Sequence, residues 1–110
     1  MKKKILSATI FLTTSAVCAE TPTFPKNELY VNARTTLLQQ GWKPVHAPER
    51  GFVCHSDPRC EGRPETVVCA GTGLANCLFR WQRDKTIIEI ETIGEDHPTV
   101  KFLECKANCQ

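Results

Sequence analysis

The sequence lacks an apolar run long enough to cross a membrane. Its main apolar stretch, from Ile5 to Leu12, is much shorter than the roughly 20 residues that a transmembrane helix needs. Lysines occupy positions 2–4 before this stretch, and Val17-Cys18-Ala19 after it is an A-x-A-like cleavage site. We therefore interpret residues 1–19 as a secretion signal cleaved after Ala19, and we expect no integral membrane segment in the mature chain.

Cys18 leaves a second interpretation of this segment open. A bacterial lipid-attachment site has Gly, Ala or Ser directly before the cysteine, whereas this chain has Val17 there. Simple secretion is therefore favoured over a lipid anchor at Cys18.

A surplus of charge of one sign is also missing once the signal is removed. The full chain has 14 Lys and Arg against 12 Asp and Glu, and three of the lysines lie in the signal, which leaves 11 basic and 12 acidic residues. A near-neutral domain lacks the basic surface by which proteins bind nucleic acids or anionic membranes. We therefore expect no nucleic-acid partner.

No catalytic or cofactor motif stands out. Gly71-Thr72-Gly73 lacks the Lys and Ser/Thr of a phosphate-binding loop and the third glycine of a dinucleotide site, so we interpret it as a tight bend. The absence of any C-x-x-C pair argues against zinc and haem. His55 near Asp57 is the single pair that suggests acid–base chemistry, and adjacent loop residues of this kind are usually solvated. We predict no catalytic, cofactor-binding or metal-binding residue, no cofactor, and a protein that is not an enzyme.

What the mature chain does contain is cysteine. Removing 19 of the 110 residues leaves 91, a length at which the core is thin and disulfides are a common remedy. Six cysteines can pair in many ways, and sequence alone does not decide among them. Local spacing favours three short loops: Cys54–Cys60, Cys69–Cys77 and Cys105–Cys109.

Apolar spacing predicts one helix near the N-terminus of the mature chain. Its apolar face recurs at i, i+4 and i+8, at Leu29, Ala33 and Leu37. Asn27 is the expected N-cap, and Gly41 follows the helix in the position that favours a left-handed backbone. Residues 42–45 are expected to be extended at a sheet edge because of Pro44, with Trp42 in the core.

Alternation of apolar and polar residues predicts a hairpin over residues 77–83 and 86–93. Asp84-Lys85 would form its loop. The resulting register places Trp81 opposite Ile88, Phe79 opposite Ile90, and Arg80 opposite Glu89. The apolar pairs then share one face and the charged pair lies on the other.

Two more strands complete the predicted sheet. Residues 66–69 form a short one, and residues 99–105 form another in which Val100 and Phe102 both join the core. The fold class is therefore α+β: one N-terminal helix packed on a small antiparallel β-sheet (a meander), stapled by disulfides. Residues 20–26 would be a loose lead-in and residues 27–110 a single domain.

The 46–64 loop has no periodicity and is rich in proline and glycine. Loops of this length are uncommon in compact domains and are often functional. A Cys54–Cys60 bridge would stiffen the loop and display its charged side chains, so we predict a recognition loop with His55, Asp57, Arg59 and Arg63. An ordinary solvated loop is the alternative interpretation.

Several segments together resemble a known family. They are Ala33-Arg34…Leu37…Gly41-Trp42…Pro44-Val45, Pro64-Glu65, and Cys69…Gly71-Thr72-Gly73…Cys77…Phe79…Trp81. Over most of the mature chain the sequence is similar to a family of small secreted or periplasmic cysteine-rich proteins of Gram-negative bacteria. The resemblance implies a periplasmic or secreted location and carries over no catalytic residue.

These observations favour a periplasmic or secreted protein-binding module with a protein partner, such as an inhibitor or immunity protein of an enzyme that acts on the cell envelope. Such a protein needs a rigid surface rather than reactive groups. The alternative is a non-catalytic protein that binds a small ligand or has a structural role in the envelope. A charged exposed sheet face would favour a protein partner, and an apolar cleft would favour a ligand.

Overall fold

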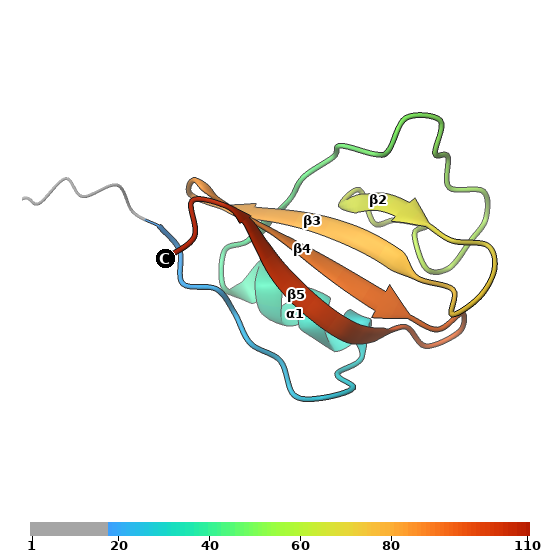
Figure 1. Cartoon of the computed structure of the whole chain (residues 1–110), viewed down its shortest axis with the longest axis horizontal. Helices are drawn as coiled ribbons and strands as arrows, with labels where there is room; N and C mark the ends of the chain where they lie inside the picture. Colours follow the sequence, from blue (N-terminus) through green and yellow to red (C-terminus); the bar gives the residue numbers. More distant parts are fainter. Residues whose placement is uncertain (1–17) are drawn as a thin grey trace, which may run out of the picture.

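The computed structural model describes residues 18–110 (Figure 1). One helix packs on a five-strand antiparallel sheet, which confirms the predicted fold class. The elements are α1 (Tyr30–Gln39), β1 (Lys43–Pro44), β2 (Thr66–Cys69), β3 (Cys77–Arg83), β4 (Thr86–Ile93) and β5 (Thr99–Ala107). In this part of the chain no helix has the length and apolar character that a membrane crossing requires. The signal predicted over residues 1–19 lies outside the described residues, apart from Cys18 and Ala19.

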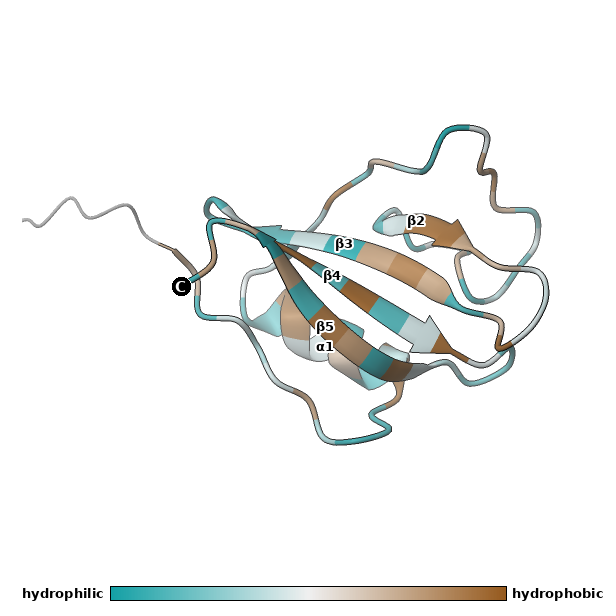
Figure 2. Cartoon of the chain, viewed as in Figure 1, coloured by the Kyte–Doolittle hydropathy of each residue, from teal (hydrophilic) through white to brown (hydrophobic). Residues whose placement is uncertain are grey.

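The strand β3 is the centre of the sheet. β4 and then β5 follow on one side, while β1 and β2 pair with different parts of its other edge. The β3–β4 hairpin has the predicted register, with Trp81 opposite Ile88 and Arg80 opposite Glu89. Because successive side chains of a strand point to opposite faces, apolar and polar residues alternate along the hairpin (Figure 2), and one face of the sheet is apolar.

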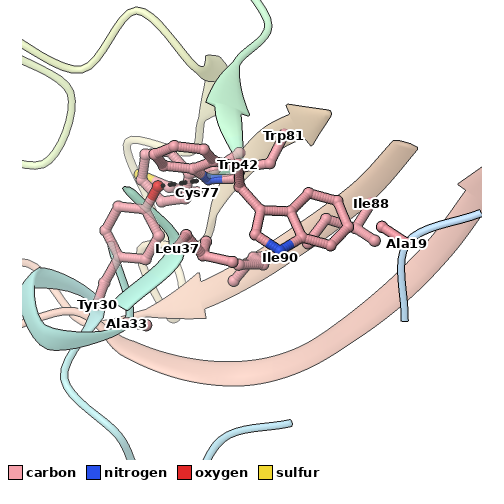
Figure 3. Packing of buried hydrophobic residues seen from close by; sticks show 10 residues of the cluster. Ala19, Tyr30, Ala33, Leu37, Trp42, Cys77, Trp81, Ile88 and Ile90 are labelled. Carbon is pink, nitrogen blue, oxygen red and sulfur yellow. Dashed lines mark hydrogen bonds between the residues drawn. The ribbon is translucent and has the colours of Figure 1, made fainter. Parts of the chain in front are cut away.

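The apolar face of the sheet packs against α1. Figure 3 shows helix and sheet side chains meeting in one buried cluster that also contains Trp42, as predicted. The ring of Tyr30 stacks on Phe79 with 3.9 Å between the ring centroids, and the indole Nε1 of Trp81 donates to the Tyr30 hydroxyl at 3.1 Å. The position of the helix on the sheet is therefore fixed by ring packing and by one buried hydrogen bond.

The end of α1 follows the predicted glycine signal. Gly41 has a φ of 86°, a conformation that side-chain-bearing residues rarely adopt. Its N–H donates to the carbonyl of Leu38 at 3.1 Å, and the N–H of Trp42 donates to that of Leu37 at 2.9 Å. This paired closure is a Schellman motif, and it turns the chain so that Trp42 enters the core.

The start of α1 differs from the prediction. The helix begins at Tyr30, and Asn27, the predicted N-cap, instead has a left-handed φ of 62°. The reason is tertiary: Leu29 forms a β-bridge with Thr99, and the N–H of Tyr30 donates to the carbonyl of Pro98 at 2.8 Å. The sheet thus holds these residues extended and supplies an acceptor for an N–H that the first helical turn leaves free.

The prediction that Phe102 joins the core is also wrong. Val100 pairs with Thr92, whereas Phe102 pairs with Glu91, because the register shifts between these two pairs. Neighbouring residues of β4 point to opposite faces, so Val100 packs against the core while Phe102 lies on the face away from α1 and is 47% exposed. The extra residue of this bulge reverses the alternation on which the prediction rested.

All three predicted disulfides form: Cys54–Cys60, Cys69–Cys77 and Cys105–Cys109. They close the middle of the 46–64 loop, join β2 to β3, and tie the C-terminal tail to the end of β5. Three disulfides in a chain of this size indicate an oxidising, extracytoplasmic environment.

Candidate functional site

The 46–64 loop leaves β1, arches away from the sheet and returns to β2 (Figure 1). Its start is held because the N–H of Glu49 donates to the carbonyl of Val67 at 2.8 Å. The two ends of the loop also meet, with His46 Nδ1 at 3.1 Å from the carbonyl oxygen of Pro64. The Cys54–Cys60 bridge closes the middle. The loop is thus fixed at several points although it contains no helix or strand.

Arg59 braces the loop from inside. Its guanidinium donates to both carboxylate oxygens of Asp57, with a shortest distance of 2.6 Å, and to the carbonyls of Ala70 and Ala75 at 2.8 and 3.1 Å. The side chain is buried, so the expectation that Arg59 is displayed for recognition is wrong. The guanidinium can bind these acceptors together because it carries five N–H donors in one plane.

The other predicted recognition residues lie in different environments. His55 is exposed on the surface of the loop, and Asp57 is engaged by Arg59. Arg63 is half-buried: its guanidinium lies over the Tyr30 ring, 4.9 Å from the centroid, and donates to the Arg59 carbonyl at 3.0 Å. The structure therefore brings Asp57 and Arg59 together, turns Arg63 toward the helix, and leaves His55 exposed. A binding role for these residues stays a prediction.

The most exposed apolar residue of the loop was missed by the sequence reasoning. Val53 is 61% exposed, and Phe52 beside it is half-buried. They border a hollow of about 290 Å³ whose other walls are His46, Pro48, the Cys54–Cys60 pair, Arg63, Pro64 and Thr66. The sequence did contain a signal for this apolar site: Phe52 and Val53 are consecutive apolar residues in an otherwise polar segment, directly before Cys54.

Glu65 anchors the end of the loop to the rest of the fold. Its side chain is fully buried and accepts from the Tyr30 hydroxyl at 3.0 Å and from Arg34 Nε at 2.6 Å. The N–H of Arg80 in β3 donates to its backbone carbonyl at 2.8 Å. One residue thus connects the loop, the helix and the central strand.

The protonation states of this cluster follow from its burial. Removal from water raises the pKa of Tyr30 far above its usual range, and the nearby Glu65 carboxylate raises it further. The hydrogen bond to Glu65 likewise raises the pKa of Arg34. Tyr30 therefore stays a hydroxyl donor and Arg34 a cation at any pH near neutrality. Because every group is already paired, the cluster is an anchor rather than a site for proton transfer.

The sheet face away from α1 carries paired charges, as predicted for this face. Arg80 Nη2 lies 2.6 Å from a carboxylate oxygen of Glu89, and Lys106 lies 3.8 Å from the other oxygen of that carboxylate. Lys101 pairs with Glu91 at 3.6 Å. These charges make the face polar, and Glu89 at their centre is itself buried.

The described residues thus form a small, disulfide-stapled α+β domain with a braced surface loop. Within residues 18–110 no group of three or more His, Cys, Asp or Glu is arranged to hold a metal ion. The chain has no significant match among protein families, among curated proteins or among solved structures. The resemblance to secreted cysteine-rich proteins of Gram-negative bacteria therefore stays a prediction.

Asp57 should titrate below an ordinary aspartate. The hydrogen bonds and charge of Arg59 lower the pKa of its carboxyl from the usual value of about 3.9. Because the folded-state pKa is lowered, the pair stabilises the fold above that usual value, and this contribution is lost as pH falls through the folded pKa. An NMR titration of the Asp57 carboxyl carbon measures the value. In Arg59→Met the pKa should rise toward 3.9, and an unchanged pKa would contradict the assignment.

Proposed function

We propose that the protein is a periplasmic or secreted module that binds another protein through the 46–64 loop. The observation that carries this proposal is a long irregular loop that is braced internally and yet displays Val53 to solvent. A preorganised loop loses little conformational freedom on binding, so more of the contact energy appears as affinity. Long loops of compact domains are the usual carriers of binding function.

The composition of the loop surface supports a protein partner. Val53 and Phe52 provide an apolar centre beside the Cys54–Cys60 bridge, and His46 and His55 are polar and exposed around it. Protein interfaces combine a small apolar core with a polar rim, and a few central residues carry most of the binding energy. The hollow beside Val53 could receive a single side chain of the partner.

An inhibitor or immunity protein of an envelope-acting enzyme is the form of this function that we favour. Such a protein blocks its target by shape and needs no reactive group of its own. Two ion pairs hold the loop in place: Glu65 with Arg34, and Asp57 with Arg59. The charged sheet face formed by Arg80 and its neighbours is also more suited to a protein surface than to an apolar ligand.

A groove beside β5 favours the second candidate, a small-ligand-binding protein. Residues 21–27 and the first half of β5 enclose a hollow of about 460 Å³, a size within the range of small-molecule pockets. Its apolar lining includes Phe24, Val100 and Phe102. This groove and the 46–64 loop are distinct sites, so substitutions distinguish the two candidates.

The test is affinity capture from a periplasmic extract with matched variants. Val53→Asp should lose the proteins that the native chain retains, because a carboxylate at the centre of the contact is not compensated. Leu74→Asp is the control, since Leu74 is 63% exposed but lies outside the loop. Denaturant melts should show all variants folded. Retention of the same proteins by Val53→Asp would overturn the proposal, and their loss with Phe102→Asp instead would place the protein contact at the groove beside β5.

A further inference from the structure

Ala19 is built into the domain. It is only 6% exposed and belongs to the buried cluster, where it lies beside Ile88 (Figure 3). Its N–H donates to the hydroxyl of Thr86 at 2.9 Å, and Thr86, the first residue of β4, is itself fully buried. Residue 19 therefore covers the start of β4 with both its side chain and its backbone.

Cys18 is held by the same junction. It forms a β-bridge with Asp84 in the hairpin turn, and its carbonyl accepts from Gln110 Nε2 at 2.6 Å. The Thr86 hydroxyl that receives the Ala19 N–H also donates to the carbonyl of Asn108 at 3.0 Å. Residues 18–19, the β3–β4 turn and the C-terminal tail thus form one hydrogen-bonded unit.

Cleavage after Ala19 would remove Cys18 and Ala19 from this unit. It would expose Ile88 and Thr86, and it would place the charged amine of Glu20 next to an uncovered apolar surface. The tail would lose the acceptor that holds Gln110. A cut at this bond therefore conflicts with the packing of the domain, although its sequence suits a signal peptidase.

We propose that the signal is cut upstream, at the Ala16–Val17 bond, so that the mature chain keeps Cys18 and Ala19. Ala16 lies directly before this bond and Thr14 two positions earlier, and both are small enough for an A-x-A-like site. The step is a hydrolysis: water is consumed, Ala16 receives the new carboxylate and Val17 the new amine. The inference rests on the expected signal and not on what the domain binds.

The retained cysteine provides a chemical signature. Among the described residues Cys18 is the one cysteine outside the three disulfides, and it is partly exposed. A chain that begins at Val17 has one thiol that can be alkylated without reduction, whereas a chain that begins at Glu20 has none. Thiol count and intact mass are therefore independent readouts of the same cut.

The experiment is expression of the full precursor in a Gram-negative host, followed by N-terminal sequencing, intact mass and alkylation of the exported protein. A start at Val17 with one reactive thiol is expected. A start at Glu20 would overturn the proposal, and so would an acylated Cys18 at the N-terminus.

Two precursor variants test the same bond without depending on folding. Ala16→Leu places a bulky residue before the proposed bond and should leave unprocessed precursor or shift the cut. Ala19→Leu should be processed at the same position as the native precursor. The opposite pattern, with Ala19→Leu blocked and Ala16→Leu processed normally, would establish the downstream site and overturn the proposal.

Discussion

Replacement of Trp81 by alanine is expected to lower the free energy of unfolding by about 3–5 kcal/mol, the range of other large-to-small changes in cores. Trp81 is fully buried in the middle of β3, directly opposite Ile88. The substitution removes its contacts with the helix and leaves a cavity that the sheet cannot close. It also removes the indole donor of the Tyr30 hydroxyl.

Denaturant melts with Leu74→Ala as control measure this effect. Leu74 lies in the turn between β2 and β3 and is 63% exposed, so its truncation should change stability by only a few tenths of a kcal/mol. A loss below about 1 kcal/mol for Trp81→Ala would mean that the hairpin presents its other face to the helix, in conflict with the register of β3 and β4.

The hairpin was predictable because two independent patterns agree on one register. The apolar residues of β3 and β4 coincide only if Trp81 faces Ile88, and this register alone brings Arg80 to Glu89. The start of α1 and the sheet face on which Phe102 lies could not be predicted in the same way. Both depend on where a distant segment pairs, through Leu29 with Thr99 in one case and through a bulge in β5 in the other.

The candidate site was predictable in outline only. Cysteine spacing indicated a closed loop, and the bridge forms as expected. The charged residues of the loop suggested exposure, because a charge in a segment rich in proline and glycine is usually solvated. The burial of Arg59 depends on the carbonyls of Ala70 and Ala75, which a separate turn brings to it. Such an acceptor pair leaves no pattern in the local sequence.

Glu65 carries the second large expected effect. Glu65→Ala should lower the free energy of unfolding by about 3 kcal/mol, the lower end of the range for breaking a buried ion pair. The change leaves the Tyr30 hydroxyl without its acceptor and Arg34 without its partner. The side chain of Arg34 is 25% exposed and can reach water, which limits the cost. Glu65→Gln should cost less, because an amide oxygen still accepts from Tyr30.

Glu61→Ala is the matched control, since Glu61 lies on the exposed side of the same loop. Thermal and denaturant unfolding should place this variant close to the native chain and Glu65→Ala far below it. A double-mutant cycle with Arg34→Ala separates the energy of the Glu65–Arg34 pair from the other effects of the substitution, and a coupling near zero would contradict the ion pair.

Hydrogen exchange should further show residues 46–64 opening in Glu65→Ala before the sheet does, because Glu65 joins the end of the loop to α1 and β3. If the loop stays as protected as in the native chain, its order comes from the Cys54–Cys60 bridge and Arg59 alone.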